Sequence, residues 1–422
     1  MLSEPLTAAK LPADIFRLGN GLTVIHQYLP ATPVVVVDVW VGAGASAEPE
    51  QWSGMAHFLE HMIFKGTEQV APGIFDSVIE SRGGTSNAAT SHDYAHFFIT
   101  TAALHLEETL PVLADIILHA AIPEAEFLRE RDVVLEEIRA SYDDPDWIGF
   151  QRLGESVYSH HPYGRSVLGD EGQLISHTPE QMRCFHQANY QPENMTVVVV
   201  GSVEQEKAIN LVNQSFQGFT SPPNIPKQPL AKVTPIRKIR RQELHLPRLE
   251  QARLLMAWVG PGVEQLGDSY GLDLLSVLLA DGRSSRLVRE LREERQLVND
   301  ISSCFSLQRD SSLFTISACL KSQYLELVEE IIGDRLRQLQ STPVSNQELS
   351  RCQRLLCNDY AFSTEAAGQL AGLYGYYNTI AKAELATAYP LQIQSFQAAD
   401  LMQLAQKYLS PNQYAVTVLK PL

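Results

Sequence analysis

The stretch WVGAG at residues 40–44 returns as WVGPG at residues 258–262, and this repetition predicts the architecture of the 422-residue chain. Two further echoes accompany it: the pairs Gly54-Met55 and Gly271-Leu272, and the runs FFITTAAL from Phe97 and LFTISACL from Leu313. All three echoes are 216 to 218 residues apart. A constant offset over three motifs is hard to obtain by chance, so the chain holds two diverged copies of one unit.

Prolines mark a boundary between the copies. Residues 218–236 contain five prolines, and proline interrupts helices and interior strands because its ring fixes φ and removes the N–H donor. We therefore expect a first domain at residues 1–217, a linker at 218–236 and a second, homologous domain at 237–422.

Strands and helices are expected to alternate within each copy. Val34 to Val41 reads as a Val-rich strand, and residues 86–101 alternate as one further strand. Helix pairs separate such strands, so the pattern predicts two α+β domains, each a sheet covered by helices. The pattern leaves open whether the sheets are antiparallel or mixed.

The charge of the chain restricts its ligands. Lys+Arg 33 and Asp+Glu 49 give a formal net charge of −16. That balance argues against binding to nucleic acid or to an anionic membrane surface, both of which require clustered Lys and Arg. It would suit cationic ligands such as basic peptides, and it also serves solubility.

The termini and cysteines bear on the compartment. The first residues lack the basic and apolar regions of a secretory signal, and no stretch approaches the roughly 20 apolar residues of a membrane span. The five cysteines form no CxxC pair, which favours a reducing compartment. We expect a soluble, cytoplasmic protein.

The segment HFLEH at residues 57–61 gathers ionisable groups on an otherwise apolar helix. His57 and His61 are four residues apart, so both imidazoles lie on one helix face and can bind one Zn²⁺. Glu60 can reach a water on the metal without being a ligand. This is the arrangement that peptide hydrolysis needs, because the metal lowers the pKa of the water and the carboxylate takes its proton.

The second copy provides a control for this cluster. Its matching positions are Leu274, Val277 and Leu278, so it keeps the apolar helix and lacks the polar groups. A chance cluster on a solvated face is disfavoured, because Phe58 and Leu59 indicate a buried helix, where unpaired ionisable groups are costly. The sequence predicts a metal site in the first domain.

A catalytic zinc needs a third protein ligand and one open position. The helix expected at residues 124–142 offers Glu130, Glu136 and Glu137. Glu130 and Glu137 project from nearly the same face, whereas Glu136 points about 100° away from Glu137. Helical periodicity alone does not choose among them.

HFLEHMIFKGT at residues 57–67, with ERDVVLEEI at residues 130–138, resembles the pitrilysin group of zinc peptidases, the inverted HxxEH enzymes. The chain is closest in size to the mitochondrial processing peptidase type of subunit, and the resemblance covers nearly its whole length. It implies two homologous domains, each a largely antiparallel sheet covered by helices, and it implies a zinc-dependent metalloendopeptidase.

The resemblance also implies roles for single residues. The family's third ligand is the second glutamate of a motif like VVLEEI, which selects Glu137, 76 residues after His61. One Zn²⁺ per chain would then be held by His57, His61 and Glu137, with Glu60 as the general base. Glu130 is implied as a carboxylate that stands behind a ligand and orients it.

An edge strand for substrate is implied as well. Asn87 and Ala88 match the strand along which the family's peptide substrates add by backbone pairing, a mode that favours extended chains.

One position departs from the family's pattern. Active members carry an Arg and a Tyr seven residues apart in a domain without zinc, and here Arg292 is followed by Asn299. The resemblance then implies that a related partner subunit supplies the Arg/Tyr pair, in a heterodimer that closes around a chamber. A non-catalytic scaffold subunit and a self-sufficient homodimeric peptidase are the alternatives.

Overall fold

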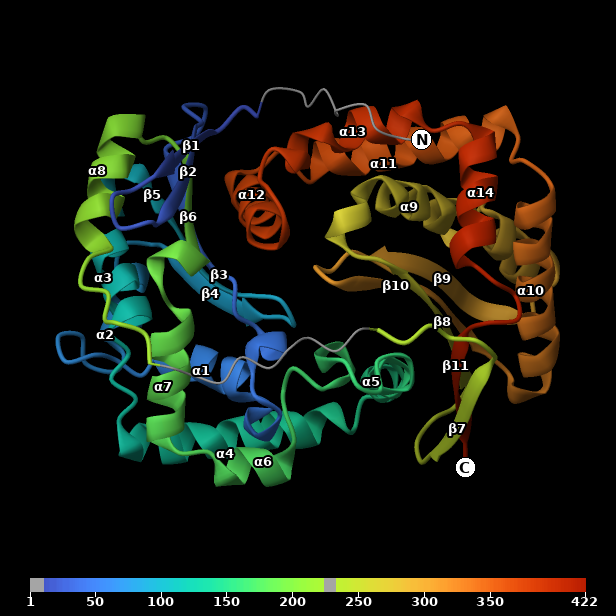
Figure 1. The fold of residues 1–422 in the computed structure, drawn as a ribbon, viewed down its shortest axis with the longest axis horizontal. Helices are drawn as coiled ribbons and strands as arrows, with labels where there is room; N and C mark the ends of the chain where they lie inside the picture. The colour runs from blue at the N-terminus through green and yellow to red at the C-terminus, as the bar shows by residue number, and fades with distance from the viewer. Residues whose placement is uncertain (1–10, 224–232) are drawn as a thin grey trace. The chain divides into compact units, whose positions relative to one another are not determined.

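The computed structural model describes residues 11–223 and 233–422. Within these ranges the chain forms one six-stranded and one five-stranded sheet, each accompanied by helices (Figure 1), which confirms the predicted α+β class. Residues 224–232 of the predicted linker lie outside the described residues. In the described ranges no helix is long and apolar enough to cross a lipid bilayer.

The six-stranded sheet has the order β1-β2-β6-β3-β5-β4. Its strands are β1 (Asp14–Arg17), β2 (Thr23–Tyr28), β3 (Val34–Val41), β4 (Thr85–Thr90), β5 (Ala95–Ala102) and β6 (Met195–Gly201). β2 and β6 run parallel, and the other neighbours are antiparallel. The sheet is therefore largely antiparallel, and β4 is one of its edges.

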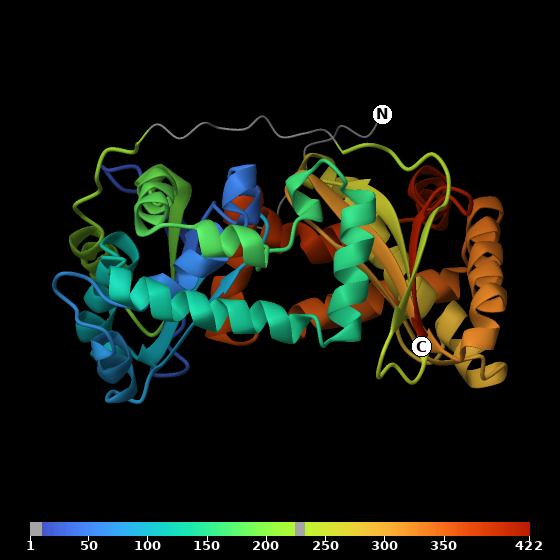
Figure 2. The ribbon, with the colours of Figure 1, turned by 90° about the horizontal axis from the view of Figure 1, so that it is seen from below.

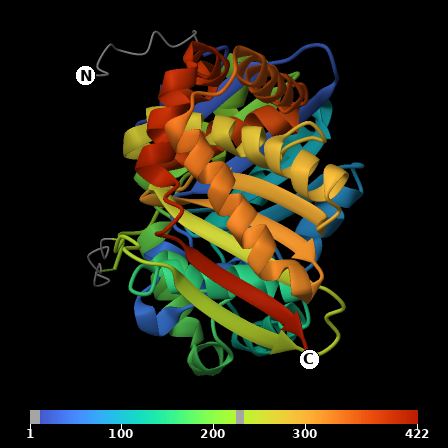
Figure 3. The same ribbon diagram turned by 90° about the vertical axis from the view of Figure 1, so that its right-hand side faces the viewer.

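The five-stranded sheet has the order β7-β11-β8-β10-β9. Its strands are β7 (Arg240–Leu246), β8 (Ala252–Pro261), β9 (Val298–Ser306), β10 (Ser311–Leu320) and β11 (Ala415–Pro421). Figure 3 shows β11 between β7 and β8, parallel to the first. Without β1, the two sheets have the same strand order, and in each the first two strands of that order run parallel. The repeat in the sequence is therefore also a repeat in topology.

The predicted strand at residues 86–101 is in fact a hairpin. β4 ends at Thr90 and β5 begins at Ala95, and the chain reverses at Ser91, whose N–H donates to Tyr94 O at 2.8 Å. More buried and less buried residues alternate along both β4 and β5. Because each strand turns one face to the core, this two-residue pattern does not reveal where the first strand ends. The reversal is what makes β4 an edge strand.

The helices form two groups. With the six-stranded sheet are α1 (Met55–Ile63), α2 (Ile74–Glu80), α3 (Leu106–Leu118), α6 (Glu171–Ser176), α7 (Pro179–Asn189), α8 (Gln205–Ser215) and α12 (Ala367–Ile380). With the five-stranded sheet are α5 (Pro145–Val157), α9 (Leu266–Ala280), α10 (Leu325–Ser341), α11 (Asn346–Phe362), α14 (Ala398–Tyr408) and a π-helix (Val288–Glu294).

The chain crosses between two compact units more than once. In the described ranges, the first unit holds residues 11–139, 165–223 and 363–388, and the second holds 140–164, 233–362 and 389–422. α4 (Glu124–Ser141), unbroken in Figure 2, and α13 (Leu385–Ser395) pass from one set of residues to the other. The domain boundaries predicted at 217 and 237 are those of the sequence repeat, and they stay a prediction. The two compact units are divided differently, because each includes segments from both halves of the sequence.

Both faces of the six-stranded sheet are covered. Val35, Val37 and Val39 of β3 face α1 and α3 in the main core. Trp40, on the opposite face and 3% exposed, packs against α12 at Gly375, where an added Cβ would lie 2.1 Å from the indole nitrogen. Figure 1 shows α3 and α8 on one side of this sheet and α12 on the other.

The five-stranded sheet receives α5 in the same way. Gly149 packs against Leu255 and Leu419, and Arg240 Nη1 donates to Ser156 O at 2.7 Å. Each half of the sequence thus contributes a helix to the unit built by the other half. Amphipathic patterns predict that a helix is covered but not which sheet covers it.

The packing of α12 predicts opposite effects for two alanine substitutions. Gly375→Ala forces Trp40 or the helix to move and should destabilise the protein by about 1–3 kcal/mol. Gly372→Ala has nothing within 4 Å of its new Cβ and should stabilise by up to about 1 kcal/mol, because alanine is the better helix former. Calorimetry of both variants checks this, and a Gly375→Ala protein as stable as the wild type would contradict the packing.

Candidate metal centre

α1 brings two imidazoles to one side of a buried helix. Gly54 (φ 86°) precedes the helix, and Phe58, Leu59 and Met62 bury its apolar side in the core. His57 and His61 lie on the other side with their rings 4.8 Å apart. The four-residue spacing therefore produces the shared face that the sequence predicts.

α4 adds a carboxylate to this pair. Glu137 Oε2 lies 3.8 Å from His57 Nε2 and 3.5 Å from His61 Nε2. In the described part of the chain, His57, His61 and Glu137 form the one group of possible ligand atoms within 4.8 Å of one another. Bonds of about 2.0–2.2 Å in a tetrahedron place ligand atoms about 3.4 Å apart, so these donors suit zinc.

The candidates on α4 differ in where they point. Glu136, with 72% of its side chain exposed, pairs with Arg139 at 2.6 Å. Glu130 is buried and pairs with His61 Nδ1 and Lys65 Nζ. Of the three glutamates that helical periodicity left open, Glu137 is the one that lies within 4 Å of both imidazoles. Its role as a metal ligand stays a prediction.

The electrostatics favour a neutral His57. Burial, together with the neighbouring His61, lowers the pKa of His57 to about 4, so the imidazole is uncharged at neutral pH. Its Nδ1 is buried, and no described group bonds to it. A neutral imidazole with its other nitrogen toward Glu137 is the form that binds a metal.

Glu130 fixes the tautomer of His61. His61 Nδ1–H donates to Glu130 Oε1 at 2.9 Å, and Lys65 Nζ lies 2.7 Å from Glu130 Oε2. Because an ionised carboxylate can only accept, the hydrogen sits on Nδ1 and the lone pair of Nε2 faces Glu137. This is the geometry expected of a carboxylate that orients a ligand.

Glu60 stands beside the cluster rather than in it. Thr90 Oγ1 of β4 donates to Glu60 Oε2 at 2.5 Å. Burial raises the pKa of Glu60, while Thr90, His61 and His96 act against that rise and Glu137 adds to it. A partly buried carboxylate with a raised pKa is suited to accepting and returning a proton.

Known proteins share this chain's fold and sequence. The family model "Insulinase (Peptidase family M16)" matches residues 23–171, and "Peptidase M16 inactive domain" matches residues 176–356. "Zinc protease PqqE" of Helicobacter pylori is 30% identical over 412 residues, covering 96% of this chain and 92% of that protein. The chain belongs to the M16 family of zinc proteases.

Further relatives agree with this membership. The M16 chain is 29% identical over 359 residues to "Uncharacterized zinc protease YmxG" of Bacillus subtilis, covering 83% of this chain and 84% of that protein. The crystal structure of a protease from Helicobacter pylori superposes with a TM-score of 0.91 at 29% identity, covering 97% of this chain and 99% of that one. The resemblance to the pitrilysin group is confirmed.

The "inactive" label of the second M16 model suits the second copy. Leu274, Val277 and Leu278 of α9, the counterparts of the polar residues of α1, are buried and apolar.

Asn87 and Ala88 lie on β4, at the edge of the six-stranded sheet. Asn87 is exposed and Ala88 packs against the core. Thr90 on the same strand bonds to Glu60, so this edge runs beside the catalytic candidates. Their role in binding substrate stays a prediction.

Arg292 lies on the π-helix of the second unit and is already paired. Its guanidinium donates to Glu293 Oε1 at 2.9 and 3.1 Å and lies 3.6 Å from Asp300 Oδ1. Asn299, in the position of the family's Tyr, is exposed on β9.

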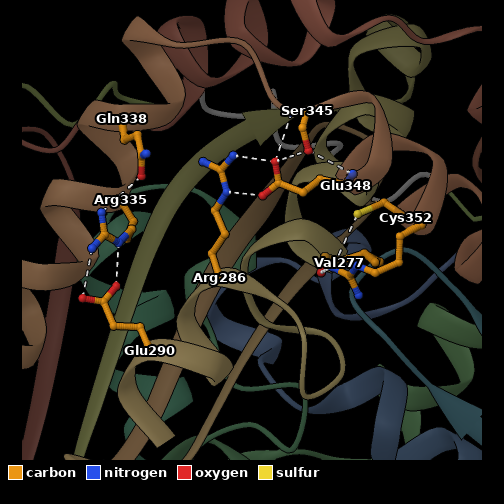
Figure 4. A network of polar contacts seen from close by, with 9 residues as sticks. Val277, Arg286, Glu290, Arg335, Gln338, Ser345, Glu348 and Cys352 are labelled. Carbon is orange, nitrogen blue, oxygen red and sulfur yellow. Dashed lines mark hydrogen bonds and ion pairs between the residues drawn. The ribbon is translucent and has the colours of Figure 1, made fainter. Parts of the chain in front are cut away.

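Two bidentate ion pairs hold the π-helix (Figure 4). Arg286 donates to both oxygens of Glu348 at 2.8 and 3.1 Å, and Arg335 donates to both oxygens of Glu290 at 2.6 and 3.0 Å. Such fork-to-carboxylate pairs fix orientation as well as distance. The backbone that carries Arg292 is thus anchored on α11 and α10.

Sequence reasoning missed three residues around the centre. Lys65 follows His61 by one helical turn, a spacing that signals a shared face. Thr90 and Glu48, a buried carboxylate that bonds to the start of α1, come from elements whose position only the tertiary fold supplies.

Adjacent glutamates of α4 should differ in their effect on zinc. Glu137→Gln removes a charged oxygen beside both imidazoles and should raise the zinc dissociation constant at least about tenfold. Glu136→Gln, a matched change on the solvent side, should leave it unchanged. Competition against a fluorescent chelator measures both, and equal affinities would exclude Glu137 as a ligand.

Proposed function

We propose that this M16 chain is a zinc endopeptidase subunit for peptides or extended targeting segments. In this proposal His57, His61 and Glu137 hold one Zn²⁺ per chain, and Glu60 is the general base. The observation that carries it is the approach of three donor atoms to within 4.8 Å beside a partly buried carboxylate.

The residues divide the chemistry between them. Zinc, when bound, lowers the pKa of a water and polarises the scissile carbonyl. Glu60 takes the proton of the attacking water and returns it to the leaving amine. Thr90 holds the Glu60 carboxylate by a hydrogen bond of 2.5 Å, and Glu130 keeps the His61 ring in one tautomer.

The substrate would bind as an added strand. β4 is an edge of its sheet, and a peptide in extended form can pair with the outer backbone groups of this strand, where Asn87 Oδ1 accepts from Ala88 N–H at 2.9 Å in the peptide-free chain. Such pairing requires a substrate without stable structure of its own. The net charge of −16 favours basic peptides among these.

A related partner subunit belongs to the proposal. Arg292 is paired with Glu293, and Asn299 lacks the phenol of the family's Tyr. We therefore propose that the Arg/Tyr pair is supplied by a second M16-type chain that closes a chamber with this one. Activity of the purified chain alone would instead favour the homodimeric alternative, and a chain without zinc would favour the scaffold alternative.

Glu60→Gln tests the general base. The amide keeps the shape and cannot accept the proton of the water, so zinc should remain stoichiometric while peptide cleavage falls at least about 100-fold. Elemental analysis and cleavage of an unstructured basic peptide, with the associated chain present, measure the two. Unchanged cleavage would sink the assignment of Glu60.

Thr90→Val tests the tuning of that base. The Thr90 hydroxyl stabilises the ionised Glu60, so its loss should raise the pKa of Glu60 further. Because the base must be ionised to act, the acid limb of kcat/KM against pH should move upward by about one pH unit. Thr85→Val, an exposed position on the same strand, is the control, and an unmoved acid limb in the Thr90 variant would refute this role.

A further inference from the structure

The start of α1 is bound by a carboxylate from outside the helix. Glu48 is 2% exposed and follows the short 3₁₀ turn Ala45–Ala47. Its Oε2 accepts from Gly54 N–H at 3.0 Å, and its Oε1 accepts from Ala56 N–H at 2.7 Å. These amides belong to the helix start, where no intrahelical acceptor exists, so Glu48 acts as the cap that Gly54 cannot provide.

Two amide donors and a nearby guanidinium favour the ionised form of Glu48, whereas its burial favours the neutral form. Burial nevertheless raises the pKa of Glu48 to about 8, because it outweighs the opposite effects of the Ala56 amide, the Arg165 charge and the Gly54 amide. Each carboxylate oxygen faces an N–H donor, so a proton on either would cost a hydrogen bond. Arg165 Nη2 also donates to Ala45 O at 3.1 Å and Glu48 O at 3.3 Å, which fixes the backbone on which Glu48 stands.

Residues 168–177 also contact Ser53 and Gly54, just before α1. A Cβ on Gly54 would lie 2.7 Å from Leu168 O and 2.8 Å from Gly169 Cα. Ser53 N–H donates to Gln173 Oε1 at 3.1 Å, and His177 Nε2 lies 3.1 Å from Ser53 O. Close packing at Gly54 and two hydrogen bonds at Ser53 therefore fix the backbone just before α1.

The two histidines of α1 are supported differently. Glu130 holds the His61 ring through Nδ1, whereas Nδ1 of His57 is buried with no described hydrogen-bond partner. The direction of His57 thus depends on its backbone and packing. Ala56, whose amide Glu48 holds, is the residue immediately before His57.

We propose that Glu48 is a positioning residue for zinc, because by fixing the first turn of α1 it aims His57 at the metal and so sets zinc affinity. The inference rests on the proposed zinc site. Groups behind metal ligands commonly contribute a factor of about 10 to 100 in affinity.

Glu48→Gln tests this, with Glu50→Gln as the matched control. The substituted side chain would set its NH₂ group against one of the two N–H donors, so the zinc dissociation constant should rise about tenfold and zinc should leave faster to a chelator. Glu50 is exposed at the start of the next 3₁₀ turn, Glu50–Trp52, so its variant should match the wild type. Cleavage by Glu48→Gln should recover in excess zinc, which loss of a catalytic group would not allow.

Two further measurements keep the inference testable if Glu48→Gln does not fold. Glu48→Asp keeps the carboxyl group but is too short to reach both amides, so it should release zinc at an intermediate rate. Hydrogen exchange of the wild-type Ala56 amide should be slow, although amides of a first helical turn are ordinarily unprotected.

The outcomes separate cleanly. Unchanged zinc affinity in a folded Glu48→Gln protein, unchanged release from Glu48→Asp, or fast exchange at Ala56 would each overturn the inference. A wild-type protein that holds no zinc would instead overturn the proposed function on which it rests.

Discussion

Helix α1 buries its apolar side in the core and presents His57, His61 and Glu60 on its other side. The contacts that surround the helix in the first unit satisfy both requirements at once. Phe58, Leu59 and Met62 each contribute about 1.5–3 kcal/mol by leaving water. The polar face would cost much of this gain if its groups had no partners. Glu130 of α4 supplies a partner for His61, and Thr90 of β4 supplies one for Glu60.

The second copy shows the scaffold without this constraint. α9 occupies the place of α1 in the repeat, and its residues Leu274, Val277 and Leu278 are buried and apolar. Two bidentate polar connections of that unit lie at the π-helix, where Arg286 and Arg335 hold carboxylates of α11 and of the π-helix itself (Figure 4). The comparison illustrates how a site can be carried by one copy of a duplicated fold.

Local patterns predicted what depends on local spacing. The separation of His57 and His61 predicted their shared face, and the Val-rich runs predicted the central strands. The choice of Glu137 over Glu130 needed the family resemblance, because side chains seven residues apart on a helix point the same way. The turn at Ser91 was missed because alternation persists across it.

The remaining features depend on contacts between distant parts of the chain. Glu48 reaches the start of α1 across a loop of no regular spacing. α12 covers the sheet at Trp40 although more than 300 residues separate them in sequence. No periodicity encodes such partners, since a helix can satisfy its apolar side on either sheet.

The exchange of segments also has a consequence for biosynthesis. A ribosome adds about 5–20 residues each second, and domains generally fold as they emerge. The first sheet is complete once Gly201 has been made, yet the helix that packs on Trp40 does not end until Ile380. For the intervening synthesis, the face of that sheet that carries Trp40 lacks the α12 cover that it has in the folded protein.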